Sequence, residues 1–289
     1  MKNIIISGFS DEITPDFDRQ LEAVREMGLT HIELRAADGV NVSDFSPYKL
    51  GQIRAKLLRA GVKVSSIGSP MGKISIEDSF YPQMEKFKRT LDIQKELGAP
   101  YMRIFSFYIP QGSQPQAWVD EVMRRMAFFT QEAARWDAVL LHENEKGIYG
   151  DNARRCLDLM EEFYGPHFQA VFDFSNFVEV GQDPLEAYGL LKPYIAYIHV
   201  KDCLAKEKRV VPAGQGDGHL PEILGDLLGG GWEGFLSLEP HLTDFSGLAL
   251  LEKDPKERPK AQEEEGRAAF QRALEALKTV LVGIQEGQG

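Results

Sequence analysis

A repeated unit constrains the fold of this chain more than any other sequence feature: an amphipathic stretch, a glycine and then a short apolar run. Residues 15–27 end at Gly28 before the run 29–34, residues 47–60 end at Gly61 before 62–67, and residues 79–97 end at Gly98 before 101–105. Glycine has no Cβ and readily adopts the left-handed backbone that stops a helix. The pattern therefore predicts successive helix–strand units.

The same order continues through the rest of the chain. Helical stretches at 115–136, 151–163, 183–191 and 219–228 precede apolar runs at 138–141, 168–172, 195–200 and 235–238. With a first strand at Ile4–Ser7 and a last helix at Glu263–Val282, eight strands alternate with eight helices. Continuously apolar strands are typical of a parallel sheet covered on both faces. Eight units favour an α/β fold of the closed (β/α)8 TIM-barrel type, and an open doubly wound sheet is the alternative.

The length of the chain is that of a single barrel. One barrel takes about 250 residues, and this chain has 289 with no evident linker. We therefore expect residues 1–289 to form one domain. The charged stretch 252–266, which holds Pro255 and Pro259, is predicted to be a surface loop before the last helix.

Composition excludes several classes of protein and partner. The 33 lysines and arginines against 44 aspartates and glutamates give a net charge of −11, which argues against nucleic acid as a partner. No apolar run reaches the roughly 18 residues that a membrane span needs. The N-terminal apolar run is too short for a signal peptide, and the chain has only two cysteines. We expect a cytoplasmic protein that does not bind membranes.

Polar residues end four successive predicted strands, and they form a coherent set. They are Glu143, Asp173, His199 and Glu239. Active sites of barrels lie at the carboxyl ends of the strands, so these side chains should meet. Three carboxylates at one rim would repel each other without a counter-charge, and a divalent metal ion supplies one. Oxygen ligands with one nitrogen suit Mn²⁺ best, with Mg²⁺, Co²⁺ and Zn²⁺ as further candidates.

At this point the sequence resembles a known family, the xylose-isomerase-like TIM barrels of the sugar phosphate isomerase/epimerase group. The resemblance covers nearly the whole chain, from FSDEITPDFDRQLEAVREMGLTHIELR to SLEPHL. Its most specific segments are HENEKGIYGD, FDFSN, HVKD, GQGDG and SLEPHL, at residues 142–151, 172–176, 199–202, 214–218 and 237–242. Each segment is weak evidence by itself, but their order and their positions at strand ends are specific.

The resemblance implies one divalent metal ion held by Glu143, Asp173, His199 and Glu239. In the epimerase branch the two metal-binding glutamates also act as acid and base on opposite faces of the substrate, roles that would fall here to Glu143 and Glu239. The chain departs from several relatives at Asn176, where they carry a substrate-contacting histidine. This departure argues against assigning one particular sugar.

The resemblance predicts an isomerase or epimerase of a ketose or related sugar, with or without a phosphate. Proton transfer next to the carbonyl would pass through an enediolate, with no organic cofactor. The alternative is a metal-dependent dehydratase of a keto-inositol or similar cyclic polyol. Endonuclease activity conflicts with the acidic charge, and the intact ligand set argues against a non-enzymatic sugar sensor. By analogy with the family, a homodimer or homotetramer is expected.

Further residues are predicted around this centre. Glu145, Asn176, Lys201 and Arg103 are candidates for substrate binding, because they end strands or follow strand ends beside the ligands. Glu33 and Arg103 are expected either to line the pocket or to form a charge pair inside the barrel. Asp202 is expected to pair with a neighbouring base, and the glycines of GQGDG to let the backbone approach the substrate closely.

Overall fold

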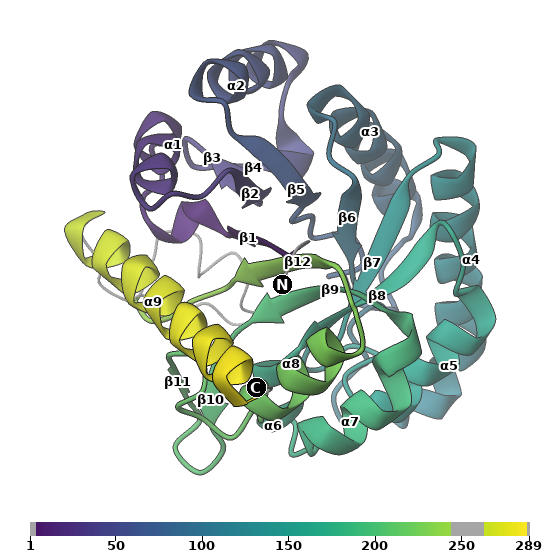
Figure 1. Ribbon diagram of the computed structural model, residues 1–289. Coiled ribbons are helices and arrows are strands. Elements are labelled where there is room, and N and C mark those ends of the chain that lie inside the picture. Colours follow the sequence, from purple (N-terminus) through teal and green to yellow (C-terminus); the bar gives the residue numbers. More distant parts are fainter. Residues whose placement is uncertain (1–3, 244–262, 288–289) are drawn as a thin grey trace.

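The computed structural model describes residues 4–243 and 263–287, and its centre is one eight-stranded sheet (Figure 1). Neighbouring strands are parallel and follow the order β1-β12-β9-β8-β7-β6-β5-β2. A bridge between Phe9 and Glu33 connects the two outer strands and nearly closes the sheet, which confirms the TIM barrel over the open sheet. The strands are β1 Ile4–Gly8, β2 His31–Leu34, β5 Lys63–Ile67, β6 Tyr101–Ile104, β7 Val139–Glu143, β8 Phe168–Asp173, β9 Ile195–Val200 and β12 Gly234–Leu238.

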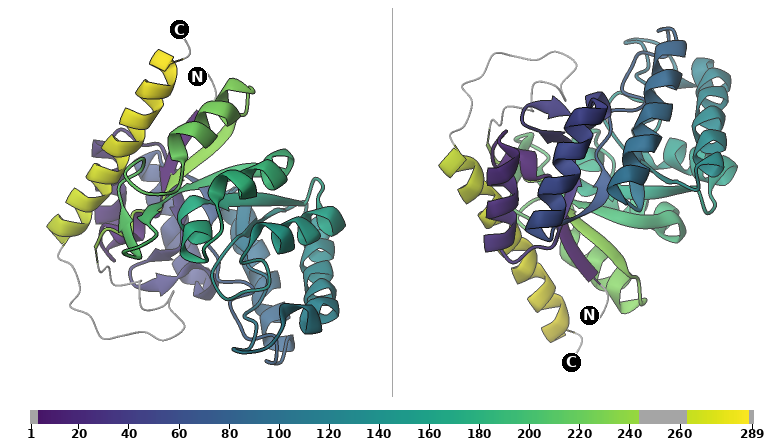
Figure 2. Two further views of the ribbon diagram at one scale, coloured as in Figure 1. Left: turned by 90° about the horizontal axis from the view of Figure 1, so that it is seen from below. Right: turned by 90° about the horizontal axis from the view of Figure 1, so that it is seen from above.

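The helices surround this barrel as an outer layer (Figures 1 and 2). They are α1 Phe17–Glu26, α2 Pro47–Ala60, α3 Tyr81–Leu97, α4 Val119–Arg135, α5 Ala153–Phe163, α6 Phe174–Glu179, α7 Pro184–Leu191, α8 Leu220–Gly229 and α9 Glu263–Gly287. The long helix α9 packs against α8 and β12 and also contacts residues Ser10–Glu12, which closely follow β1. None of the described helices combines the length and the apolar character needed to cross a bilayer.

Two of the three glycine stops named from the sequence cap their helices, whereas α1 ends at Glu26 with Met27 as its cap. Gly61 and Gly98 have φ values of 67° and 63° and cap α2 and α3 in the left-handed conformation. The Gly61 N–H donates to the carbonyl oxygens of Leu57 and Leu58, which the end of a helix leaves without partners. This local chemistry sets the spacing at which each strand starts.

The structure also has elements that the hydrophobic pattern did not predict. The hairpin β3 Ala36–Ala37 with β4 Val40–Asn41 follows β2, and the hairpin β10 Asp202–Leu204 with β11 Arg209–Val211 follows β9. Short 3-10 helices lie at η1 Ser10–Glu12, η2 Val42–Asp44, η3 Pro115–Trp118 and η4 Lys192–Tyr194. The short helix α6 begins directly after β8, because Asp173 ends the strand and caps the helix at once.

The predicted loop 252–266 is described only at its end. Residues 252–262 lie outside the described residues, and Glu263–Gly266 already belong to the first turn of α9. The predicted strands five and six prove to be longer than the apolar runs, because β7 ends at Glu143 and β8 at Asp173. Both carboxylates are thereby part of the rigid barrel.

Candidate metal centre

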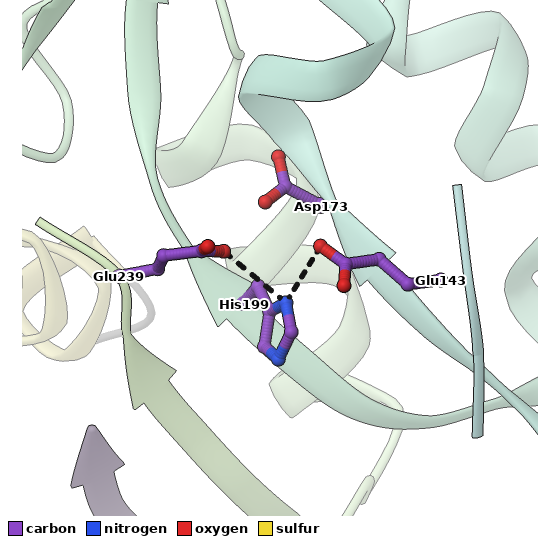
Figure 3. Close-up of side chains that lie close together, drawn as sticks. All are labelled: Glu143, Asp173, His199 and Glu239. Atoms are coloured by element: carbon purple, nitrogen blue, oxygen red, sulfur yellow. Dashed lines mark hydrogen bonds and ion pairs between the residues drawn. The ribbon is translucent and has the colours of Figure 1, made fainter. Parts of the chain in front are cut away.

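Four side chains meet at the carboxyl end of the barrel, and they are the four ligands named from the sequence. Glu143 ends β7, Asp173 ends β8, His199 lies near the end of β9, and Glu239 follows β12. One ligand atom from each lies within 4.8 Å of the other three, and all four residues are buried. Figure 3 shows Glu143 and Glu239 on opposite sides of the imidazole, with Asp173 completing the group.

His199 contacts carboxylates through both ring nitrogens. Nδ1 lies 3.1 Å from Glu143 Oε1 and 3.4 Å from Glu239 Oε2, and Nε2 lies 3.1 Å from Glu33 Oε2. Burial by itself would lower the pKa of His199, but the charges of Glu33 and Glu143 raise it well above its ordinary value. Without a metal ion, an imidazolium therefore supplies positive charge to this group of acids.

The two oxygens of Asp173 serve different purposes. Oδ1 accepts the Asn176 N–H at 2.8 Å and caps α6, whereas the buried Oδ2 accepts no hydrogen bond from the described residues. Burial raises the pKa of the Asp173 carboxyl to about 8, although the nearby Lys201 ammonium opposes the shift. At neutral pH the Asp173 carboxyl is therefore largely protonated, and a cation bound beside it, in addition to Lys201, would favour its ionised form.

The residues present fit a divalent cation. Besides Asp173 Oδ2, Glu143 Oε2 is buried and accepts no hydrogen bond from the described part of the chain. Two ligands on opposite sides of Mg²⁺ lie about 4.2 Å apart, close to the spread of the four ligand atoms. Three carboxylates and one imidazole form a donor set suited to Mn²⁺, Mg²⁺, Co²⁺ or Zn²⁺. The four side chains are therefore grouped in a way that is consistent with a divalent-metal site.

Lys201 and Arg103 bring positive charge to these ligands. Lys201 Nζ lies 3.0 Å from Asp173 Oδ2 and 3.4 Å from Glu239 Oε2. Arg103 Nη1 lies 3.1 Å from Glu143 Oε2. Of the two expectations for Glu33 and Arg103, charge pairing inside the barrel agrees with their contacts. Glu33 pairs with His199, and Arg103 pairs with Glu143. The ammonium of Lys201 lies where it competes with a bound cation.

We expect Lys201→Met to bind Mn²⁺ at least about tenfold more tightly than the unsubstituted protein. Removing the ammonium favours both a proton and a metal ion on Asp173, but a dication gains about twice as much Coulomb energy as a proton. Titration calorimetry measures the affinity. Lys192→Met is the matched control, because Lys192 pairs with Asp226 on an exposed surface. Unchanged or weaker binding by Lys201→Met would contradict this expectation.

The remaining two candidates for substrate binding lie at different depths. Asn176 Nδ2 donates to Glu143 Oε1 at 3.3 Å and to the Asn144 carbonyl at 2.8 Å, so its amide touches a ligand directly. Glu145 does not continue β7, which ends two residues earlier. Its carboxylate accepts from Lys73 Nζ at 2.7 Å and is more exposed than the four ligands. Asn176 belongs to the centre, and Glu145 lies nearer to solvent.

Asp202 is a correction to the sequence interpretation. Among the residues that the structure describes, its carboxylate has no basic side chain as a partner; it accepts the backbone N–H groups of Cys203, Gly214, Gly216 and Gly218. A Cβ on Gly216 would lie 2.3 Å from Asp202 Oδ1, and one on Gly218 would lie 2.7 Å from it. These two glycines of GQGDG are needed for close approach to Asp202, so the loop is wrapped around a buried carboxylate.

A second charged group borders the centre, and its role was not evident from the sequence. Arg35 donates to Asp11 Oδ2 at 2.9 Å and to Glu12 Oε1 at 3.3 Å, and its Nη1 lies 3.7 Å from Glu239 Oε1. His241 Nε2 lies 3.3 Å from the same Glu239 oxygen. Glu239 thus presents Oε2 to His199 and Lys201, and Oε1 to Arg35 and His241. Asp11 and Glu12 closely follow β1 in the sequence. Their position after a strand end is the sequence feature that could have indicated this charged group.

Comparisons with known proteins agree with this fold. A family model described as Xylose isomerase-like TIM barrel matches residues 21–280. A search of curated protein sequences finds no match. An L-ribulose 3-epimerase structure has a TM-score of 0.75 at 18% identity, covering 100% of this chain and 97% of its own. The probable 3-DHS dehydratase AsbF from Bacillus anthracis has a TM-score of 0.67 at 19% identity, covering 83% and 92%.

One further solved structure contains a metal ion. It is a xylose isomerase-like TIM barrel protein from Mycobacterium smegmatis in complex with magnesium, with a TM-score of 0.67 and 18% identity. The alignment covers 96% of this chain and 97% of that one. At these identities the three structures establish a shared fold.

Proposed function

Because the chain belongs to the xylose isomerase-like TIM barrel family, we propose that it is a divalent-metal-dependent isomerase or epimerase of a ketose or related sugar. One observation carries the proposal: two buried glutamates approach the cluster of ligand atoms from opposite sides of His199 (Figure 3). An epimerase needs a proton acceptor on one face of a carbon and a proton donor on the other. The placement of Glu143 and Glu239 supports assigning these two roles to them.

Glu143, Asp173, His199 and Glu239 would hold the metal ion. A divalent ion there would supply the positive charge that polarises a substrate carbonyl and stabilises the enediolate. In the metal-free protein, burial raises the pKa values of Glu143 and Glu239, but neighbouring cations dominate and lower both. Both glutamates are therefore ionised at neutral pH, the state in which a carboxylate accepts a proton from carbon.

The proposed proton transfer uses both glutamates, one as proton acceptor and the other as proton donor. One glutamate takes the proton from the carbon next to the carbonyl, and the electron pair of that C–H bond moves into the enediolate. The opposite glutamate, after taking a proton from water, donates it to the other face, which inverts the carbon, and the first glutamate then releases its proton to water. Arg103 and Asn176 orient Glu143, whereas Lys201, Arg35 and His241 contact Glu239. Both carboxylates contact His199, and their other partners are different.

We further propose that Lys201, Asn176 and Arg103 bind substrate oxygens beside the metal ion. Their side chains contact the ligand carboxylates and carry the hydrogen-bond donors that a sugar hydroxyl or enediolate oxygen needs. Glu145, held by Lys73, would contact the substrate nearer the entrance. The partner that this centre fits is a small sugar, and its acidic ligands are unsuited to a nucleic-acid backbone.

Incubation in D₂O with a panel of ketoses, keto acids and inososes tests the proposed function. The metal-supplied protein should incorporate deuterium at a carbon next to the carbonyl of at least one panel member, detected by NMR. An epimer or isomer as product supports the first proposal. Loss of water supports the alternative, a dehydratase of a keto-inositol or similar polyol, since the proton abstraction is shared and a probable 3-DHS dehydratase has this fold. Absence of exchange with every member would contradict both.

A further inference from the structure

Glu33 is a buried carboxylate at this end of the barrel that is neither a candidate metal ligand nor part of the proposed acid–base pair. It is 1% exposed and belongs to β2, on the opposite side of the barrel from β7 and β8 in strand order. A buried carboxylate is costly unless it is paired and hydrogen-bonded. Its partners therefore indicate why it is there.

Glu33 contacts His199 on the nitrogen that faces away from the other ligands. Glu33 Oε2 lies 3.1 Å from His199 Nε2 and accepts the Ser237 hydroxyl at 2.7 Å. Its other oxygen, Oε1, accepts no hydrogen bond from the described residues. Within the described residues, His199 is the one ion-pair partner of Glu33. The pair joins residues 33 and 199, from strands that are not neighbours in the sheet.

The backbone around Glu33 has an irregularity that places its side chain. Pairing between β2 and β5 steps from Ile32–Val64 to Glu33–Ser66, which leaves Ser65 as an extra residue. Bulges of this kind redirect the side chains beside them. The Ser65 hydroxyl donates to the Ile32 carbonyl at 3.0 Å and lies 2.9 Å from the Tyr197 hydroxyl, so the bulge is tied into the barrel interior. The bulge beside Glu33 is therefore anchored by hydrogen bonds inside the barrel.

We propose that Glu33 is the positioning residue of His199: it holds a proton on Nε2, turns Nδ1 towards Glu143 and Glu239, and thereby strengthens binding of the divalent ion. The inference rests on the proposed metal-dependent function. An imidazole has one lone pair to give a metal ion, and a carboxylate on the other nitrogen decides which nitrogen offers it. Phe9 restrains the ring further, with its edge contact to His199 at a centroid distance of 5.3 Å.

Metal affinity of Glu33 variants tests the proposal independently of turnover. We expect Glu33→Gln to bind Mn²⁺ about tenfold more weakly and Glu33→Ala up to about 100-fold more weakly, measured by calorimetry. Glutamine keeps an acceptor but loses the charge, so its effect should be the smaller. Glu132→Gln is the matched control, because Glu132 is a buried carboxylate of α4 paired with Arg135. Its Mn²⁺ affinity should be unchanged.

Two outcomes separate this inference from the proposed function. If the unsubstituted protein binds Mn²⁺ and Glu33→Gln binds it equally well, the role of Glu33 is wrong and the metal centre stands. If the unsubstituted protein binds no divalent ion, both proposals fail.

NMR of histidine-labelled, unsubstituted protein gives a result even if the variants do not fold. With Zn²⁺ as a diamagnetic probe, His199 should keep its proton on Nε2 and change its Nδ1 shift on metal binding. His199→Asn serves to assign the signal. A Zn²⁺-dependent change at Nε2, with the proton on Nδ1, would overturn the proposal.

Discussion

Replacing either Glu143 or Glu239 with glutamine should lower kcat by at least about 10³-fold while leaving the fold intact. Positioned acids and bases contribute about 10²–10⁴-fold to rate, and each glutamate is also proposed to hold the metal ion. Glutamine is close in shape to glutamate but cannot accept the proton from carbon. Turnover with the substrate found in the D₂O screen measures the loss, and circular dichroism checks the fold.

Isotope exchange sharpens this expectation for an epimerase. The glutamate facing the C–H bond of one epimer starts the reaction from that epimer, so each variant should lose exchange with a different epimer. Glu132→Gln, far from the centre on α4, should retain the parent rate. Full activity in both glutamate variants would remove these residues from catalysis.

Removing the metal ion should abolish turnover reversibly and lower the melting temperature by about 5–10 °C. A ligand present at 100 times its Kd stabilises a protein by about 2.7 kcal/mol, and a chain of this size gains about 2–4 °C per kcal/mol. Treatment with EDTA, then dialysis and addition of Mn²⁺, provides the comparison. Activity that persists at full rate after chelation, with no metal detected in the protein, would contradict this expectation.

The metal affinity should also rise steeply with pH between about 6 and 8. Burial raises the pKa of Asp173 to about 8, and Glu33 and Glu143 raise that of His199 against the effect of burial, so both groups hold protons in the metal-free protein at neutral pH. A metal ion must displace those protons. We expect up to about two protons released per ion at pH 7 and fewer at pH 9. Calorimetry in buffers of different ionisation enthalpy counts them.

The metal-free protein should show the opposite trend in stability. The folded chain binds more protons at Asp173 than the unfolded chain between its ordinary pKa of 3.8 and its raised value of about 8. Stability from this group therefore falls as pH rises through that range. A metal ion cancels the penalty, because it favours the carboxylate. Stabilisation by Mn²⁺ that is equal at pH 6 and pH 8 would contradict the account.

The fold and the grouping of the four candidate ligands could be predicted from the sequence because both depend on local, periodic signals. Glycine stops such as Gly61 and Gly98 mark the helix ends, and apolar runs mark the strands. Once the barrel is inferred, the ends of its strands must share one rim, so Glu143 and Asp173 meet without any knowledge of side-chain contacts. The structure brings together the ligand atoms that this reasoning selected.

The partners of individual polar residues could not be predicted in this way. Asp202 is the last residue of HVKD, and nothing local in the sequence indicates that four backbone N–H groups, one from Cys203 and three from a later loop, surround it. Glu33 contacts His199, which lies 166 residues later in the chain. Hydrophobic alternation does not reveal the bulge in the strand pairing beside Glu33. Such contacts depend on side-chain direction inside the closed barrel, which residue type and spacing leave undetermined.

Metal analysis of the purified protein tests the central claim most directly, namely that Glu143, Asp173, His199 and Glu239 form a divalent-metal centre. After dialysis against buffer with Mn²⁺ and removal of the excess, the protein should contain close to one ion per chain. Asp173→Asn, which removes a ligand charge but keeps its shape, should contain far less. A metal content near zero in the unsubstituted protein would contradict the account, and so would equal contents in both proteins.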